Sequence, residues 1–167
     1  MTERAAWTAD EALEQLYAAH WRQLVRLSVL LVRDQGTAEE VVQDAFVAVH
    51  ARWSRLRDPD RALAYLRQAV VNRSRSALRH RAVVARHAAT VRLADSADPT
   101  PDSDRRAAVL AAMRALPDRQ REVLALRYYL DLSEADIADT LGISRGAVKS
   151  HASRGAATLR SLLQEDQ

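Results

Sequence analysis

Five side chains near the C-terminus have the chemistry to hydrogen-bond with nucleic acid. They are Arg145, Lys149, Ser150, His151 and Arg154. Arginine and lysine donate to guanine acceptors and to phosphates, and serine can bond either group. The stretch from Ile143 to Leu163 holds four basic residues and no acidic one. If these side chains point outward from one helix, the stretch predicts a surface that binds the major groove of duplex DNA.

The residues just before this surface have the spacing of a helix-turn-helix. Ala138 is small where two short helices must cross, and Gly142 follows four residues later, where a tight turn favours positive φ. Ser144 suits the N-cap of the second helix. The apolar residues that fill the wedge between the helices are Ile137, Leu141, Ile143 and Val148. The pattern predicts a recognition helix from Ser144 onward.

A second basic stretch lies in the first half of the chain. Trp53 to Ala82 holds eight arginines and two aspartates, whereas Met1 to Arg52 is net acidic. Acidic residues are absent from Arg67 to Arg81, so the arginines there cannot be neutralised within the stretch. Two separated basic stretches indicate two contact surfaces for a polyanion.

Helical periodicity runs through most of the chain, and no strand alternation appears. The pattern predicts an all-α protein of two small helical domains, residues 9–82 and 104–163, joined by a flexible linker over 83–103. For the second helix, the Thr37 hydroxyl is the expected cap and Glu40 its capping-box partner. The predicted helices are Asp10–Val32, Thr37–Trp53, Asp60–Arg81, Asp104–Leu116, Asp118–Leu130, Ser133–Leu141 and Ser144–Leu163.

Three motifs resemble those of extracytoplasmic-function (ECF) sigma factors. Thr37–His50 is similar to the polymerase-binding helix of that family, and Ala64–Ser76 is similar to its promoter-melting and minus-10 helix. Leu116–Tyr128 resembles the helix that leads into the minus-35 reader. The resemblance covers Glu11 to Leu163, in the family's order and spacing. It implies the fold already predicted, a sigma region 2 bundle followed by a sigma region 4 helix-turn-helix.

The resemblance also implies a role for each surface. Region 2 is expected to dock on core RNA polymerase (β and β′ subunits) through Glu40, Gln43, Asp44 and Val47. It is expected to capture the opened minus-10 strand through Arg57, Arg61, Arg67, Asn72, Arg73, Arg75 and Arg79. Region 4 is expected to read the minus-35 duplex through Arg145, Lys149, Ser150, His151 and Arg154. The implied partners are core polymerase, promoter DNA and an anti-sigma protein.

Some positions depart from the family pattern. His151 stands where the family more often has arginine, and Gly155 is a weaker helix former than usual there. These departures bear on the promoter sequence rather than on the role. Trp53 ends an apolar-faced helix, which favours packing in the core over stacking on a base.

The composition favours a binding protein over an enzyme. Cysteine is absent, and the sequence shows neither a nucleophile–base pair nor a metal constellation nor a phosphate-binding glycine loop, so no catalysis, metal or cofactor is predicted. No apolar run reaches 18 residues and no secretory signal is evident, which predicts a cytoplasmic protein without membrane insertion. Two alternative functions as a binding protein stay open. The chain could be a transcription regulator that binds duplex DNA alone, or an adaptor that binds polymerase without reading DNA.

Overall fold

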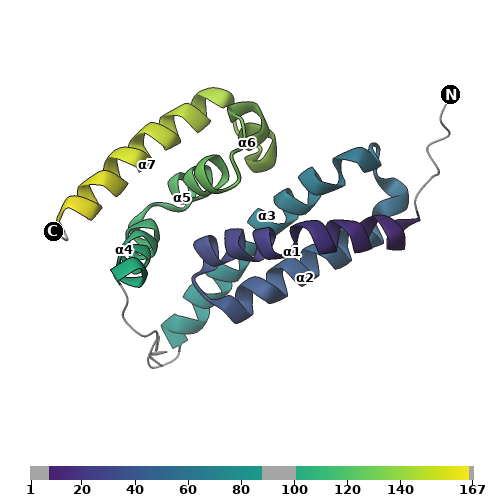
Figure 1. The fold of residues 1–167 in the computed structure, drawn as a ribbon, viewed down its shortest axis with the longest axis horizontal. Helices are drawn as coiled ribbons and strands as arrows, with labels where there is room; N and C mark the ends of the chain where they lie inside the picture. The colour runs from purple at the N-terminus through teal and green to yellow at the C-terminus, as the bar shows by residue number, and fades with distance from the viewer. Residues whose placement is uncertain (1–7, 88–100, 166–167) are drawn as a thin grey trace.

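The structure is a computed structural model that describes residues 8–87 and 101–165, and this part of the chain is helical with no strand. Figure 1 shows two bundles, which confirms the predicted all-α class. The first unit holds α1 (Ala9–Val32), α2 (Gln35–Ala51) and α3 (Ala62–His87), with the short turns η1 (Trp53–Arg55) and η2 (Pro59–Arg61) before α3. The second unit holds α4 (Pro101–Ala115), α5 (Asp118–Leu124), the π-helical turn η3 (Ala125–Tyr129), α6 (Glu134–Leu141) and α7 (Arg145–Glu165).

The predicted start of α2 is wrong. Asp34, not Thr37, is the N-cap: its carboxylate accepts the Thr37 backbone N–H at 2.8 Å and the Thr37 hydroxyl at 2.6 Å. The hydroxyl is therefore a donor to Asp34, and Glu40 lies in the helix interior rather than in a capping box. These bonds from Thr37 lower the pKa of Asp34. A carboxylate at a helix N-terminus is also favoured by the helix dipole, which explains why Asp34 takes this position.

The core of the first unit lies where α1, α2 and α3 meet. Its fully buried side chains include Leu24, Leu27, Val42, Leu66 and Val70. One polar contact crosses this apolar interior: the hydroxyls of Ser28 on α1 and Ser74 on α3 lie 3.0 Å apart, and both residues are buried. The two hydroxyls are hydrogen-bonded to each other, so neither is left unpaired in the apolar interior.

The helix ends differ from expectation at three further places. α3 runs to His87 instead of ending at Arg81, and α4 begins at Pro101 instead of Asp104, so residues 83–87 and 101–103 of the predicted linker are helical. Residues 88–100 of that linker lie outside the described residues. The expected single helix from Asp118 to Leu130 is α5 followed by η3, because the backbone widens to a π turn at Ala125.

The two units are in contact. α3 lies against α6, and α1 lies against α4 and η3 (Figure 1). The sequence predicts two domains on a tether, and no pattern in it indicates this packing. The domain boundaries at 82 and 104 stay predictions. Among the described helices, none combines the length and apolar character needed to cross a bilayer.

Close packing of α5 on α7 explains one departure from the family pattern, the glycine at position 155. Gly155 is buried, and a Cβ built there would lie 3.1 Å from Leu124 Cδ1 and 3.2 Å from Gln120 Cβ. Contacts this short mean that Leu124 or Gln120 would have to shift by a few tenths of an ångström to admit even a methyl group. The weak helix former at this position therefore lets two helices of the second unit approach each other.

A Gly155→Val substitution is expected to destabilise the second unit by about 1–3 kcal/mol, because the added methyl groups overpack the α5–α7 contact. Thermal denaturation followed by circular dichroism measures the change. Gly146→Ala on the same helix is the matched control. A Cβ there meets only Ser144 Oγ, at 3.9 Å, so this variant should be as stable as the parent or about 0.5–1 kcal/mol more stable. Equal stability of the Gly155→Val variant would contradict the packing argument.

Candidate nucleic-acid interfaces

α6 and α7 form the predicted helix-turn-helix. Ser133 caps α6 by accepting the Asp136 N–H at 3.1 Å, and Gly142 ends α6 at φ 64°. The Ser144 hydroxyl then accepts the Ala147 N–H at 3.1 Å and caps α7. Ile137, Leu141 and Val148 are buried between the helices. The predicted turn and the Ser144 cap are confirmed, and so is the wedge, in which Ile143 is only half-buried.

The outer face of α7 is open to solvent. Arg145, Lys149, Ser150 and Arg154 are exposed, and His151 is half-buried. Lys149 Nζ lies 3.8 Å from a carboxylate oxygen of Glu134, and the Lys149 side chain is 69% exposed. An exposed ion pair of this kind is weak, so Lys149 remains available to a phosphate or a base edge.

A groove of about 960 Å³ lies between the end of α2 and one face of α3. Four of the residues around it are arginines: Arg52, Arg55, Arg57 and Arg73. Asn72 and Gln68 add amide groups, and Tyr65 adds a ring. Cationic side chains attract a phosphate backbone, while amides hydrogen-bond to base edges and aromatic rings stack on bases. The groove is therefore suited to an unpaired nucleic-acid strand.

The outer face of α2 makes a third candidate surface. Glu40, Gln43, Asp44 and Val47 all point away from the core and are exposed, Val47 to 63%. An apolar side chain this exposed, flanked by polar groups, is typical of an interaction site. The surface is distinct from the groove, because the groove begins only at Ala48 and the following residues.

Comparison with known families places both units. The model for "Sigma-70 region 2" matches residues 16–83, and that for "Sigma-70, region 4" matches residues 106–159. The "ECF RNA polymerase sigma factor SigM" of Mycobacterium tuberculosis is 34% identical, over 91% of this chain and 77% of that protein. The chain belongs to the ECF family of RNA polymerase sigma factors.

Two more relatives agree with this assignment. The sigma factor is 32% identical to the "Probable RNA polymerase sigma factor RfaY" of Xanthomonas campestris pv. campestris, over 95% of its own length and 42% of that longer protein. A solved structure of CnrH in complex with the cytosolic domain of CnrY matches with a TM-score of 0.74 and 26% identity. That match covers 96% of this chain and 97% of CnrH.

The structure brings together only some of the predicted minus-10 residues of this sigma factor. Arg57, Asn72 and Arg73 line the groove. Arg79 is exposed further along α3, and Arg61 lies in η2. Two others lie on the side of α3 that faces the second unit, which partly covers them. These two are Arg67 and Arg75.

Sequence reasoning did not single out four groove residues, Arg52, Arg55, Tyr65 and Gln68. A signal for two of them was present. Tyr65, Gln68 and Asn72 are spaced by three and four residues, so they share one helix face with the asparagine that was identified. Arg52 and Arg55 carry no such signal, since their place depends on how the turn after α2 folds. Trp53 packs against the core, as the sequence predicts.

Proposed function

We propose that this ECF sigma factor binds core RNA polymerase, recognises the minus-35 and minus-10 promoter elements, and opens the DNA so that transcription begins. The observation that supports the proposal most strongly is the pairing, on one chain, of an exposed recognition helix with an arginine-lined groove. The first suits duplex DNA and the second suits a single strand. A regulator that only binds duplex DNA does not need the groove.

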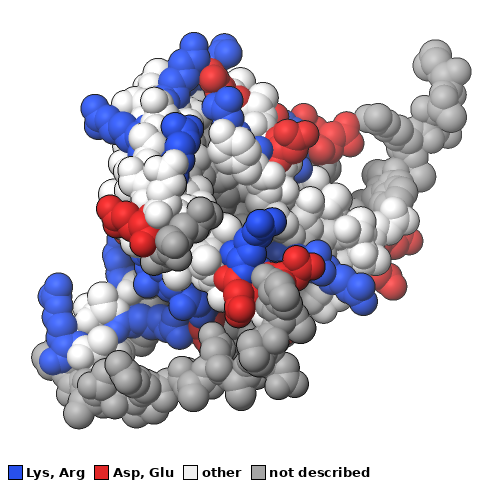
Figure 2. Space-filling model, turned by 60° about the vertical axis from the view of Figure 1, so that its left-hand side comes forward, with Lys and Arg blue, Asp and Glu red and all other residues white. Residues whose placement is uncertain are grey.

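The minus-35 contact is assigned to Arg145, Lys149, Ser150, His151 and Arg154. All five are on α7, after the cap that fixes the first turn of this helix. In a helix-turn-helix, the N-terminal part of the second helix meets the base edges. Figure 2 shows one face of the molecule on which basic side chains are widespread and acidic ones lie among them. A mainly basic surface increases the rate of encounter with DNA.

The minus-10 contact is assigned to the groove between α2 and α3. Arg57, Asn72 and Arg73 are the predicted residues that line it, and we add Tyr65 and Gln68. An extruded base needs hydrogen bonds to its edge and a ring or apolar surface against its face. The side chains around the groove provide both, together with cations for the phosphates.

The polymerase contact, with the β and β′ subunits, is assigned to the outer face of α2. An anti-sigma protein is the second protein partner that we propose. One relative of known structure, CnrH, was solved in complex with the cytosolic domain of CnrY. In this chain Val83 and Val84 at the end of α3 are 53% and 49% exposed, which leaves apolar surface for such a partner.

Run-off transcription with purified core polymerase and genomic promoter fragments tests the proposal. Addition of the sigma factor is expected to produce promoter-specific transcripts that core polymerase alone does not make. The absence of any stimulation over core polymerase would contradict the proposed function.

A Lys149→Ala/Arg154→Ala variant is expected to lose minus-35 binding and to keep polymerase binding. If an arginine reads a guanine, its loss costs about 1–3 kcal/mol, and loss of a phosphate contact weakens every sequence and flattens the salt dependence. Gel-shift titrations of a minus-35 duplex at several salt concentrations measure both effects. Arg160→Ala, an exposed arginine further along α7, is the matched control. Unchanged duplex affinity in the double variant would show that α7 is not the reader.

A further inference from the structure

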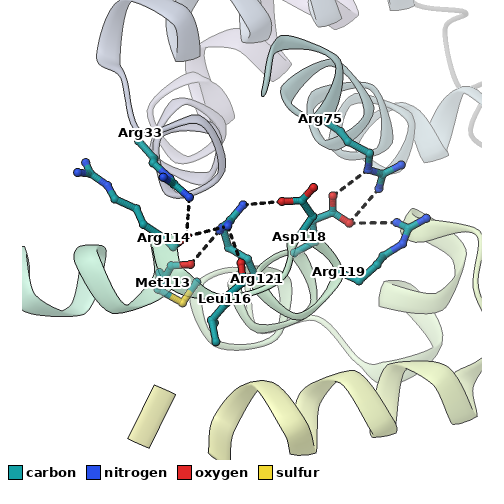
Figure 3. Close-up of polar contacts among 9 residues, drawn as sticks. Arg33, Arg75, Met113, Arg114, Leu116, Asp118, Arg119 and Arg121 are labelled. Carbon is teal, nitrogen blue, oxygen red and sulfur yellow. Dashed lines mark hydrogen bonds and ion pairs between the residues drawn. The ribbon is translucent and has the colours of Figure 1, made fainter. Parts of the chain in front are cut away.

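The side of α3 that faces the second unit carries an ion pair with close geometry. Arg75 Nε and Nη2 each donate to a different carboxylate oxygen of Glu122 on α5, both at 2.9 Å (Figure 3). The Glu122 side chain is only 5% exposed and also accepts from Arg119 at 3.0 Å. These bonds raise the pKa of Arg75. Bidentate pairs of this kind are the strong ones, because both donors are satisfied in one plane.

Two more arginines of the first unit face acids of the second. Arg61 Nη2 lies 3.9 Å from Asp139 Oδ2, with both side chains mostly exposed. Arg67 is half-buried, and burial lowers its pKa. The negative charge of Asp136 acts in the opposite direction and partly offsets this effect. Asp136 and Asp139 are both on α6, the helix that contacts α3. Two carboxylates of the second unit, Glu122 and Asp139, therefore pair with arginines that the sequence assigns to the minus-10 strand, and a third, Asp136, adds its negative charge near Arg67.

A carboxylate resembles a phosphate in the two respects that matter to arginine. Both carry negative charge on oxygens that lie close together, and both accept two parallel bonds from one guanidinium. We propose that Glu122, Asp136 and Asp139 act as an internal substitute for the phosphates of the opened strand. In this closed form the second unit competes with DNA for the arginines, and it must separate from α3 before they can hold a strand. The inference rests on the proposed function.

The contact that accompanies the ion pairs limits how firmly the units are held. Arg33, the residue that ends α1, donates through Nη2 to the carbonyl of Arg114 at the end of α4 (Figure 3). Arg121 donates to the same carbonyl at 3.1 Å, so two guanidinium groups lie close together. Burial, followed by the charges of Arg121 and Arg114, lowers the pKa of Arg33. The hydrogen bond from Arg33 favours closure, while the like charges of Arg33 and Arg121 oppose it, and this balance favours a reversible association.

Promoter geometry also requires the units to separate. The names of the minus-35 and minus-10 elements imply a separation of about 25 base pairs, which is about 85 Å along B-form DNA at about 3.4 Å per base pair. A compact unit of about 70 residues has a radius of gyration of only about 11 Å. Two such units in direct contact through α3 and α6 cannot lie on both elements at once.

The experiment measures closure and strand binding in the same molecules. The chain has no cysteine, so Gln23→Cys on α1 and Ser161→Cys on α7, both exposed, accept a donor and an acceptor dye without background. In this labelled chain, Asp136→Asn/Asp139→Asn and, separately, Glu122→Gln remove the competing carboxylates and keep every arginine. Energy transfer reports closure, and titration with a mixed-sequence 12-nucleotide single strand reports affinity.

Both carboxylate variants are expected to lower energy transfer and to bind the single strand about 3–10 times more tightly than the parent, because a larger fraction of molecules is open. Asp131→Asn/Glu165→Gln, which changes charge equally at exposed sites of the second unit, should leave both readouts near the parent values. Asp136 and Asp139 are exposed, so their substitution does not threaten folding even if Glu122→Gln does.

Unchanged energy transfer and affinity in the Asp136→Asn/Asp139→Asn variant would overturn the proposal. Lower energy transfer without tighter strand binding would overturn it too, because the carboxylates would then not compete with DNA. Run-off transcription by the parent chain separates this failure from failure of the proposed function. That assay depends on sigma activity and not on which residues close the chain.

Discussion

An Arg121→Met variant is expected to lose most of the stability of the second unit. Arg121 is 3% exposed, and its guanidinium donates to the carbonyls of Met113, Arg114 and Leu116 at 2.9, 3.1 and 2.6 Å (Figure 3). It also pairs with Asp118 at 3.1 Å. These carbonyls belong to the end of α4 and the residue after it, where a helix leaves acceptors unsatisfied and a cation is favoured.

Methionine fills a similar volume but donates nothing. Met113 O keeps the Leu116 N–H and Arg114 O keeps Arg33, but every bond from the charged Arg121 guanidinium is lost. A hydrogen bond to a charged group contributes about 1.5–3 kcal/mol, so a total loss of about 3 kcal/mol or more is expected. For a unit of this size that is a fall in melting temperature of more than about 10 °C. Thermal denaturation is the measurement, and Arg160→Met, at an exposed position of α7, is the control for loss of positive charge. A fall of less than about 3 °C would show that Arg121 does not hold the end of α4.

An Asp44→Arg variant is expected to abolish transcription by preventing association with core polymerase. Asp44 is exposed on the outer face of α2 beside Gln43, and it makes no contribution to the core. Charge reversal at the centre of an interface replaces attraction with repulsion and leaves a charge unpaired, which typically costs several kcal/mol. We expect the affinity for core polymerase to fall at least about 100-fold, while duplex affinity for the minus-35 element stays unchanged.

The control for this variant is Glu14→Arg, which makes the same kind of charge change at an exposed site on α1. Fluorescence anisotropy with labelled sigma factor gives the polymerase affinity, and gel shifts give the duplex affinity. Normal polymerase binding by the Asp44→Arg variant, or a defect confined to duplex DNA, would mean that the outer face of α2 is not the docking surface.

The helix-turn-helix was predictable because its signals are local. Gly142 at positive φ, Ser144 as a cap and buried Val148 each follow from residue type and spacing within a few positions. The start of α2 was not predictable in the same way. Asp34 and Thr37 both suit an N-cap, and the choice between them depends on where the chain leaves α1. The π turn at Ala125–Tyr129 was missed because one widened turn hardly disturbs an apolar pattern.

The candidate sites differ in the same way: those with local sequence signals were predicted, and those that depend on packing between distant residues were not. Asn72 and Arg73, which line the groove, were identified because the motif that contains them resembles the minus-10 helix of the family. The pairing of Arg75 with Glu122 joins positions 47 residues apart and depends on how two units pack. No local pattern carries that information. Sequence reasoning therefore treated the arginines of α3 as one surface, whereas the structure divides them between a groove and a contact with the second unit.

The hydroxyls of Ser28 and Ser74 meet inside an apolar bundle, and this has a consequence for how the family can vary. Replacing one serine by alanine leaves the other hydroxyl without a partner, whereas replacing both removes the polar group altogether. The two positions should therefore change together during evolution, as a pair of hydroxyls or a pair of small apolar residues. Mixed pairs should be rare among relatives that keep this bundle.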